Sequence, residues 1–340
     1  MILLSRRLVV AVGLVALAGC RAEHLAPVRT TTAQAPRAKH VVINEAVRTL
    51  LYLPLYRAQD SGCFSRRGLQ VDIVTGGTAA ASFAALVTGH ASFAQADPMY
   101  VPIAREKGTA DARLVAQVVG RIAVWGVTRD PALREITRAS LKGRVISTHK
   151  RPMTAYAYTL KVLTDLGLTP GTDVKIIENQ PGAELAPLYR GDADLAFTLE
   201  PQVSQAEANG AHVVVSLPQR YGDQIFTGLM TTRDVLTRDP SMVEATVRCY
   251  QEALTELHTD PMVGVTTAKK YFPSLDPSVL SAAVKRLLAD EVIPKTILVS
   301  EDSWTKAMRV RLAEHDLQRP ETRNENSDVA LMERVASGRP

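Results

Sequence analysis

One short sequence pattern occurs in two similar copies in this chain, and its repetition limits the folds that the chain can adopt. Residues 89–98 read GHASFAQADP and residues 191–201 read GDADLAFTLEP. Each copy contains a short strand pattern and ends in an acid followed by proline, which is typical of a helix start. Around both copies, strand and helix patterns alternate in the same order. This alternation predicts two similar α/β lobes, each with a mostly parallel sheet covered by helices.

The chain begins with the pattern of an export signal. Arg6 and Arg7 precede an apolar run from Leu8 to Leu17, and small residues follow it. A basic start, an apolar centre and a small-residue end are typical of a secretory signal. The alternative is a short transmembrane anchor, but the run has only about half of the roughly 20 residues that a membrane-spanning helix needs.

The end of this run is more specific than its apolar centre. Leu-Ala-Gly-Cys at positions 17–20 resembles the lipobox of bacterial lipoproteins. The resemblance implies a signal peptide of residues 1–19, cleavage before Cys20, and acyl chains such as palmitate on the Cys20 thiol. Two or three acyl chains would hold the protein on a bacterial membrane, outside the cytoplasm. Residues 20–39 are polar, and we expect them to form a flexible tether.

The rest of the chain has the composition of a globular protein. The whole chain has 340 residues, of which 46% are hydrophobic, and its mean hydropathy is −0.01. The formal charge of +5 would fall by two, to +3, on loss of Arg6 and Arg7. No run of basic residues with interleaved aromatic residues occurs, so the sequence carries no signal of nucleic-acid binding.

Three cysteines bear on the compartment and on metal binding. If Cys20 is acylated, Cys63 and Cys249 remain in an oxidising compartment, where they could form a disulfide. Two buried free thiols are the alternative, because sequence spacing does not give the distance between them. No Cys-x-x-Cys or His-x-x-x-His pattern occurs, so we expect no structural metal site and no cofactor.

Six phrases between residues 40 and 290 resemble the solute-binding proteins of ABC importers. The resemblance is greatest to the group that serves sulfonates, taurine, nitrate and thiamine-precursor pyrimidines. No single phrase decides it, but their order and spacing together are specific. The phrases are LPLYRAQDSGCFSRRGLQVDIVTGG, AALVTGHASFAQADP, LKGRVIS, LTDLGLTPGTDVKII, PLYRGDADLAFTLEP and TTRDVLTRDPSMVEATVRCYQEAL.

This resemblance implies a type II-like periplasmic binding protein, in which two Rossmann-like α/β lobes are joined by a hinge of two chain crossings. The first lobe would comprise residues 40–122 and 226–323, and the second lobe residues 123–225. The polar residues 324–340 are expected to fray. The resemblance further implies a monomer that captures a small polar solute between its lobes by hinge closure. The closed form would then dock on an ABC permease in the cytoplasmic membrane.

Ligands of open α/β lobes bind beyond the carboxyl ends of the strands, where backbone N–H groups and helix N-termini are exposed. The predicted strands of this chain end in five loops, and we expect these loops to line the cleft. The loops are Asn44-Glu45-Ala46, Thr75-Gly76-Gly77-Thr78, Gln95-Ala96-Asp97, Ser147-Thr148-His149 and Thr198-Leu199-Glu200.

The loop of residues 75–78 is the best single candidate among the five. Gly76 and Gly77 would let the backbone approach a solute, and the Thr78 hydroxyl can cap the next helix. An ordinary strand-to-helix turn is the alternative. The two interpretations are compatible, because a turn at the carboxyl end of a strand is where a solute belongs.

The charged residues of these loops leave the sign of the solute open. Glu45 is either a solute contact or a partner for Arg48, and Arg48 could clamp an anion. Asp97 and Glu200 each precede proline, which favours helix capping, although carboxylates in the cleft would favour an amine or amidine. The sequence therefore allows a sulfonate- or nitrate-like anion and also a pyrimidine-like compound.

In the second lobe, the candidates are hydroxyl groups and one imidazole. Ser147 and Thr148 carry hydroxyls that suit a sulfonate or a carboxylate. His149 could add charge or serve the structure, and Thr154 stands at the expected start of the next helix.

Aromatic side chains near the loops could stack on a planar solute. The candidates are Tyr52, Trp125 and Tyr221. Most aromatic residues on helices belong to the core, so a purely structural role is the alternative for all three.

Two other functions use the same scaffold. One is an enzyme of the pyrimidine- or menaquinone-synthesis type, but the cysteine-rich motif of the pyrimidine synthases and a Gly-x-Ser-x-Gly elbow are absent from the sequence. The other is a sensory protein that presents a bound ligand to a membrane partner. We expect a solute-binding protein and not an enzyme, since site residues and not the fold decide the function.

Overall fold

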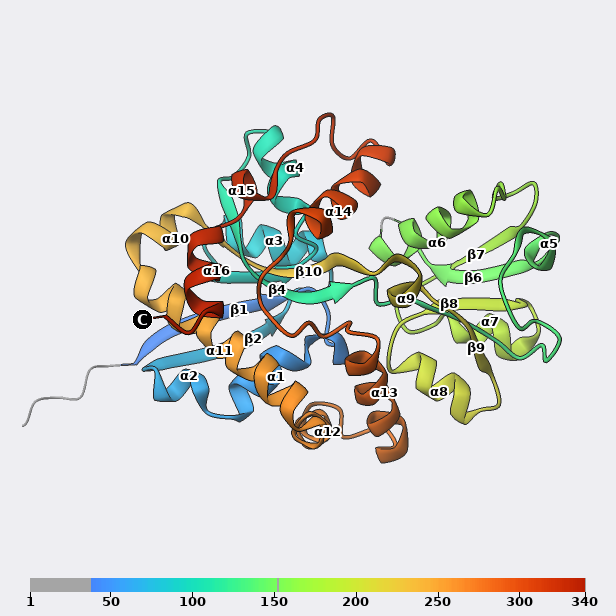
Figure 1. Ribbon diagram of the computed structural model, residues 1–340, viewed down its shortest axis with the longest axis horizontal. Helices are drawn as coiled ribbons and strands as arrows, with labels where there is room; N and C mark the ends of the chain where they lie inside the picture. Colours follow the sequence, from blue (N-terminus) through green and yellow to red (C-terminus); the bar gives the residue numbers. More distant parts are fainter. Residues whose placement is uncertain (1–37, 152, 340) are drawn as a thin grey trace, which may run out of the picture. The chain divides into compact units, whose positions relative to one another are not determined.

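The computed structural model describes residues 38–151 and 153–339, and Figure 1 shows it. The predicted signal peptide, Cys20 and the predicted tether up to residue 37 lie outside the described residues. From Ala38 onward the chain forms one compact unit with two five-stranded sheets. This architecture confirms the prediction of two α/β lobes. No helix among the described residues is both long enough and apolar enough to cross a membrane.

The first sheet has the strand order β2-β1-β3-β10-β4. Strand β1 is parallel to β2 and β3, whereas β10 is antiparallel to both β3 and β4. All of its strands except β10 therefore run in the same direction. The strands are β1 (Lys39–Glu45), β2 (Leu69–Thr75), β3 (Phe93–Ala96), β4 (Ala112–Arg121) and β10 (Asp223–Thr232).

The second sheet has the order β7-β6-β8-β5-β9. Strand β6 is parallel to β7 and β8, and β5 is antiparallel to β8 and β9. The strands are β5 (Trp125–Thr128), β6 (Val145–His149), β7 (Lys175–Asn179), β8 (Leu195–Thr198) and β9 (His212–Ser216).

The two sheets share one topology, and the repeated phrase supplies the same strand in each. Its two copies contain β3 and β8, which both occupy the third place in their sheets. The antiparallel strand of each sheet, β10 or β5, occupies the fourth place and directly follows a crossing of the chain. The chain leaves the first sheet after Arg121, enters the second at Trp125 and returns at Asp223.

Helices connect the strands and follow the last one. We call the first sheet with the helices packed on it lobe 1, and the second sheet with its helices lobe 2. The helices of lobe 2 are α5 (Arg138–Leu141), α6 (Thr154–Asp165), α7 (Leu185–Arg190), α8 (Gln202–Ala208) and α9 (Leu217–Tyr221). The helices of lobe 1 are η1 (Leu50–Tyr52), α1 (Leu53–Asp60), α2 (Cys63–Arg66), α3 (Ala79–Val87), α4 (Tyr100–Glu106), α10 (Arg233–Arg238), α11 (Pro240–Thr259), α12 (Pro261–Tyr271), α13 (Pro277–Ala289), α14 (Glu301–Ala313), α15 (Arg323–Asn326) and α16 (Val329–Ala336).

Three consecutive helices of lobe 1 begin in the same way, at an Asp-Pro pair. Proline occupies the first helical position of α11, α12 and α13, where its missing N–H costs no hydrogen bond. The preceding aspartates cap these helices, since each carboxylate accepts a hydrogen bond from a backbone N–H of the first turn. The capping residues are Asp239, Asp260 and Asp276.

The last residues of the chain differ from the sequence expectation. Residues 324–340 were expected to fray, yet the structure forms α16 and buries one face of it through Leu331, Met332 and Val335. The backbone N–H of Asp328 donates to the carbonyl of Leu114 on the edge strand β4, at 2.9 Å. The segment is polar on average, but its three apolar side chains lie on one face of the helix, which is enough to pack it against lobe 1.

The two cysteines of the folded unit form a disulfide. Cys63 at the start of α2 and Cys249 on α11 are bonded, with their Cα atoms 5.6 Å apart and 186 positions between them in the sequence. Of the two alternatives that the sequence left open, the structure therefore has the disulfide.

Candidate functional site

All five predicted loops lie at the carboxyl ends of strands, but their first residues still belong to the strands, and Ser147-Thr148-His149 is wholly part of β6. Glu45 ends β1, Thr75 ends β2 and Asp97 follows β3, and these parallel strands end at one edge of the first sheet. His149 ends β6 and Thr198 ends β8 at the corresponding edge of the second sheet. The strand ends therefore form two groups, one in each lobe.

A direct contact joins the two groups. The hydroxyl of Thr154, the first residue of α6 in lobe 2, donates a hydrogen bond of 2.7 Å to Oδ2 of Asp97 in lobe 1. Since α6 follows β6 in the chain, the carboxyl edges of the two sheets meet at this point. The contact brings two of the predicted site residues together across the lobes.

Glu45 is the centre of a hydrogen-bond network in lobe 1. Its carboxylate is fully buried and accepts from the hydroxyl of Tyr56 at 2.6 Å and from the hydroxyl of Thr75 at 2.8 Å. Nε of Arg48 lies 2.7 Å from the same carboxylate. Burial raises the pKa of Glu45, and these three donors oppose that rise. The predicted partnership of Glu45 and Arg48 is therefore present.

Arg48 keeps part of its guanidinium available beyond this ion pair. The side chain is 39% exposed, and its central carbon lies 5.1 Å from the ring centre of Tyr56 and 5.8 Å from that of Tyr271. The two rings hold the guanidinium by cation–π attraction. Within the part of the chain that the structure describes, Arg48 pairs with the carboxylate of Glu45 through Nε. The two terminal nitrogens of Arg48 can therefore bind an anion.

Three buried polar atoms at the strand ends have no hydrogen-bond partner among the described residues. They are Oδ1 of Asn44, Nε2 of Gln95 and Nδ1 of His149. The other amide atom of Gln95, Oε1, accepts from the Tyr250 hydroxyl at 2.6 Å, which fixes the direction of the amide. A buried polar atom without a partner costs about 1–3 kcal/mol, and such atoms in native proteins call for a functional explanation.

The imidazole of His149 is neutral and held in one orientation. Burial lowers the pKa of His149 to about 4, so the ring carries no charge at neutral pH. Its Nε2 lies 3.0 Å from Oε1 of Glu184, a carboxylate that is itself buried. Nε2 therefore carries the proton and donates it to Glu184, and Nδ1 is left as an acceptor.

The hydroxyls of Ser147 and Thr148 already have partners inside lobe 2. Ser147 donates to the carbonyl of Glu184 at 2.6 Å and accepts from the Asn179 amide at 2.8 Å. Thr148 shares a hydrogen bond of 2.8 Å with Thr159 of α6. Both side chains are fully buried, which favours a positioning role over the predicted contact with a solute.

The two glycines of the loop of residues 75–78 differ in the space around them: Gly76 is tightly packed, whereas Gly77 is open. A Cβ on Gly76 would lie 2.6 Å from Oδ1 of Asn44 and 3.0 Å from the backbone nitrogen of Ser82, so only glycine fits there. Gly77 has a φ of +85° and no atom near its missing Cβ. The Thr78 hydroxyl caps α3 by accepting from the N–H of Ala81, as predicted.

The aromatic candidates lie in structural positions. Trp125 is fully buried, and its indole Nε1 donates to Oδ2 of Asp290 at 2.7 Å. Tyr52 belongs to the core of lobe 1, and the Tyr221 hydroxyl donates to Asp165 at 2.7 Å. These placements favour packing roles over the predicted stacking on a solute.

Asp97 and Glu200 each accept a backbone N–H near the start of a helix and also make a cross-lobe contact. Oδ1 of Asp97 accepts from the N–H of Met99 at the start of α4, and Glu200 accepts from the N–H of Ser204 on α8. Oδ2 of Asp97 also accepts from the guanidinium of Arg311. Glu200 thus satisfies an N–H of the first turn of α8, whereas Asp97 accepts from Met99, which itself occupies the N-cap position of α4, so the predicted capping role is present for Glu200 alone. Neither carboxylate is left unpaired.

Sequence reasoning missed the arginines that meet these acids. Arg311 of α14 and Arg286 of α13 lie more than 80 positions from their partners, and no local pattern links them. One signal was available for Arg311: it follows Trp304, Ala307 and Met308 on the buried face of α14. A cation on the apolar face of a helix predicts a buried acidic partner.

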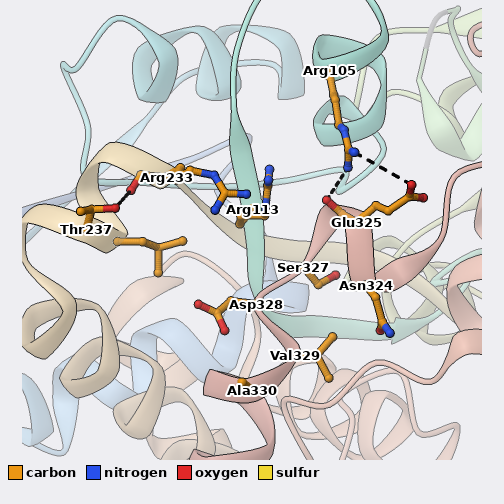
Figure 2. Close-up of a pocket in the computed structure, with 11 residues that line it drawn as sticks. Arg105, Arg113, Arg233, Thr237, Asn324, Glu325, Ser327, Asp328, Val329 and Ala330 are labelled. Atoms are coloured by element: carbon orange, nitrogen blue, oxygen red, sulfur yellow. Dashed lines mark hydrogen bonds and ion pairs between the residues drawn. The ribbon is translucent and has the colours of Figure 1, made fainter.

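A separate hollow of about 740 Å³ lies on lobe 1, and Figure 2 shows it. Arg113 near the amino end of β4 and Arg233 after β10 line it, and both pair with Asp111. Because β4 is parallel to β1–β3 and β10 is antiparallel, this hollow lies at the opposite edge of the sheet from Glu45 and Gln95. The hollow is therefore distinct from the predicted site.

Comparison with known proteins places the chain in a family. Residues 51–263 match the family described as NMT1/THI5 like. The chain belongs to this family. A relative of the NMT1/THI5-like chain is YtlA from Bacillus subtilis (strain 168), which bears the name of a binding protein. The two are 22% identical over 301 residues, which cover 87% of this chain and 90% of YtlA.

Solved structures share the fold of this NMT1/THI5-like chain. The periplasmic aliphatic sulphonate binding protein SsuA from Escherichia coli has a TM-score of 0.68 at 15% identity and covers 86% of this chain and 91% of its own. The periplasmic nitrate-binding protein NrtA from Synechocystis PCC 6803 has a TM-score of 0.67 at 12% identity and 90% coverage of both chains. The desulfurization enzyme DSZB also has this fold, with a TM-score of 0.65, 14% identity, and coverage of 88% of this chain and 99% of its own.

Proposed function

We propose that this chain is the solute-binding component of an ABC importer and that it works outside the cytoplasm. It captures a small polar organic solute between the strand ends of its two lobes and releases it unchanged to a permease in the cytoplasmic membrane. The observation that carries this proposal is the set of unpartnered buried atoms at the strand ends of both lobes, on Asn44, Gln95 and His149. The name of the relative YtlA, a putative binding protein, and the likeness to SsuA and NrtA support it.

The chemistry of the site favours two classes of solute. Arg48 offers terminal N–H groups to a sulfonate- or nitrate-like anion, and planar guanidinium groups bind such oxygens well. The free atoms include the acceptors Asn44 Oδ1 and His149 Nδ1 and the donor Gln95 Nε2. Such a mixed set also suits a neutral pyrimidine-like compound, which carries both ring acceptors and amino donors.

The proposed location has two supports. The disulfide between Cys63 and Cys249 suits an oxidising compartment. The lipobox-like residues before Cys20 suit export and acylation of that thiol. We propose that acyl chains on Cys20 anchor a monomer to a bacterial membrane. Replacing Cys20 with serine is expected to release the protein into the soluble fraction, and full retention in the membrane fraction would refute the anchor.

An enzymatic function on this fold is the second candidate, because DSZB is an enzyme with the same fold. A third candidate, a sensory protein, would bind the solute equally well. Mass spectrometry of the solute after prolonged incubation with the protein separates the first two, since a binding protein returns the solute unchanged. Solute uptake into vesicles that hold the cognate permease separates transport from sensing.

The main test uses a substitution that removes a free atom without harming the fold. Asn44→Leu has nearly the same shape and deletes the unpartnered Oδ1, so the unliganded protein should be as stable as the wild type or more stable. Thermal-shift screening with sulfonates, nitrate and aminopyrimidines should find a ligand that stabilises the wild type; at 100 times its Kd a ligand adds about 2.7 kcal/mol. The variant should lose about tenfold or more in affinity.

The matched control is Thr237→Val, which lies in the hollow at the opposite sheet edge. This variant should bind the solute with wild-type affinity. Wild-type affinity in Asn44→Leu would remove the strand ends from the site. A flat response of the wild type to every solute class would contradict the transport function itself.

A further inference from the structure

Two carboxylates occupy matching places in the two lobes, and a cross-lobe contact forms at each. Asp97 follows β3 and Glu200 follows β8, and these strands hold the same place in their sheets. Both residues end the repeated phrase of the sequence, in front of a proline. They are 8% and 1% exposed, respectively. The internal repeat thus places one buried acid at the meeting edge of each lobe.

The first contact, which we call the Asp97 clasp, consists of Asp97, Thr154 and Arg311. Thr154 of lobe 2 donates to Asp97 at 2.7 Å, and Arg311 on α14 of lobe 1 donates to the same threonine hydroxyl at 3.0 Å. Arg311 also pairs directly with Asp97. Two groups of lobe 1 therefore hold one hydroxyl of lobe 2.

The second contact, which we call the Glu200 clasp, consists of Glu200, Glu207 and Arg286. Nε of Arg286 on α13 of lobe 1 donates to Oε1 of Glu200 in lobe 2 at 2.7 Å, and its terminal nitrogen pairs with Glu207 of α8. Figure 1 shows α13 and α14 on either side of the strands β4 and β10, whose ends lead into the chain crossings. The two clasps thus flank the hinge.

We infer that the Asp97 clasp and the Glu200 clasp hold the two lobes together when no solute is bound, and that they thereby set the affinity for solute. The statement on affinity rests on the proposed function, whereas the statement on lobe contact does not. Asp97, Thr154 and Glu200, which the sequence suggested as solute contacts, act in this inference as positioning residues. Contacts that do not involve solute favour closure equally for every solute.

The energetic basis is the cost of breaking the cross-lobe contacts, namely the hydrogen bonds of Thr154 and the pair of Arg286 with the fully buried Glu200. Opening the lobes would return Thr154 and Arg286 to water, while Glu200 is buried and needs its partner. In a protein that is already closed, the solute contacts need not supply the free energy of closing the lobes. The apparent Kd for solute therefore falls as the closed fraction of the unliganded protein rises. Weakening the clasps should therefore raise the apparent Kd, chiefly through faster release of the solute.

The test compares the wild type with the double variant Thr154→Val/Arg286→Met, using small-angle X-ray scattering without solute. Valine keeps the shape of threonine and leaves the pair of Asp97 and Arg311 intact. The buried carboxylate of Asp97 therefore keeps its positive partner in lobe 1. The double variant should have a larger radius of gyration than the wild type, while an unchanged far-ultraviolet circular dichroism spectrum shows that it is folded. Identical scattering curves for the two folded proteins would overturn the inference.

Arg286→Lys serves as a second variant, in case the double variant fails to fold. Lysine keeps the charge opposite Glu200 but cannot reach both Glu200 and Glu207 through a planar fork. The radius of gyration of Arg286→Lys should lie above that of the wild type, and equality of the two would count against the Glu200 clasp. The matched control is Arg233→Met, which breaks an exposed ion pair within lobe 1 and should scatter as the wild type does.

Binding measurements complete the test and keep it separate from the proposed function. For whichever solutes stabilise the wild type, the double variant should bind about tenfold more weakly with the same rank order among solutes. A changed rank order would mean that Thr154 touches the solute, which would overturn its role as a positioning residue. If no solute class binds the wild type, the proposed function fails, while the scattering comparison still decides whether the clasps hold the lobes.

Discussion

The indole nitrogen of Trp125 lies 2.7 Å from Oδ2 of Asp290, and this hydrogen bond joins the first strand of lobe 2 to the end of α13 in lobe 1. Asp290 also accepts from the Ser216 hydroxyl at 3.0 Å and from the Gln219 amide at 2.7 Å. Trp125 follows the first chain crossing, and Ser216 and Gln219 precede the second. One carboxylate therefore fixes both crossing segments to the same point of lobe 1.

Replacing Asp290 with alanine should destabilise the protein strongly. The change leaves the buried N–H of Trp125 without an acceptor and frees two further donors, so the free energy of unfolding should fall by at least about 2 kcal/mol. Urea unfolding followed by tryptophan fluorescence measures this loss. Asp290→Asn keeps one acceptor oxygen and should lose less; equal stability of Asp290→Ala and the wild type would contradict the anchoring role.

The buried imidazole of His149 should make stability depend on pH. Its pKa is lowered to about 4 by burial, whereas a free imidazole titrates near a pH of about 6.5. Between these values the unfolded chain binds a proton that the folded chain does not, so stability falls as pH falls through this window. Burial raises the pKa of the neighbouring Glu184, so the contribution of this carboxyl group to stability falls as pH rises.

His149→Gln isolates the contribution of the imidazole, because glutamine can still donate to Glu184 and does not titrate. Relative to the wild type, this variant should gain up to about 3 kcal/mol of stability as the pH is lowered from 7 to 4. Urea unfolding of both proteins across this range gives the difference. A difference that does not vary with pH would mean that His149 is not the titrating group.

The two adjacent glycines should respond differently to the same substitution. Gly76→Ala would force its Cβ against Oδ1 of Asn44 and the backbone of Ser82, at an expected cost of about 1–3 kcal/mol and with a loss of solute affinity. Gly77→Ala meets no atom and should lose only about 1 kcal/mol through its left-handed backbone. Equal losses in denaturant unfolding would show that close packing against Asn44 is not what requires Gly76.

Removing the disulfide should lower stability without altering the strand ends. The double variant Cys63→Ala/Cys249→Ala opens a link between residues 186 positions apart and should lose about 2–5 kcal/mol. Dithiothreitol should lower the melting temperature of the wild type towards that of the variant and leave the variant unchanged. A wild type that is insensitive to the reductant would speak against the disulfide.

The sequence predicts the strand ends well because they depend on local patterns. The acid-Pro phrase and the Gly76-Gly77 turn each mark a place where a strand stops and a helix begins, and such signals lie within a few residues. For the same reason, the cap at Thr78 and the pairing of Glu45 with Arg48 were within reach of sequence reasoning.

Contacts between distant segments were not predictable in this way. Arg311 meets Asp97 across 214 positions, and Trp125 meets Asp290 across 165. The sequence contains many acids that could pair with Arg311 and many acceptors for the indole of Trp125, and only the folded structure shows which of them lies within reach. The helix α16 was missed for a different reason, since its apolar face of Leu331, Met332 and Val335 becomes useful only when α11 and β4 offer a surface to cover.

The place of β10 in the first sheet constrains the order in which the chain can be assembled. This strand lies between β3 and β4, although the whole of lobe 2 separates it from β4 in the chain. The sheet of lobe 2 is contiguous in the chain and can form as soon as Ser216 is available, whereas the first sheet stays split until residues 223–232 are available. During synthesis from the amino terminus, the sheet of lobe 2 can therefore be completed before the sheet of lobe 1, and until then the edge of β3 that later pairs with β10 is exposed to wrong pairing with other strands.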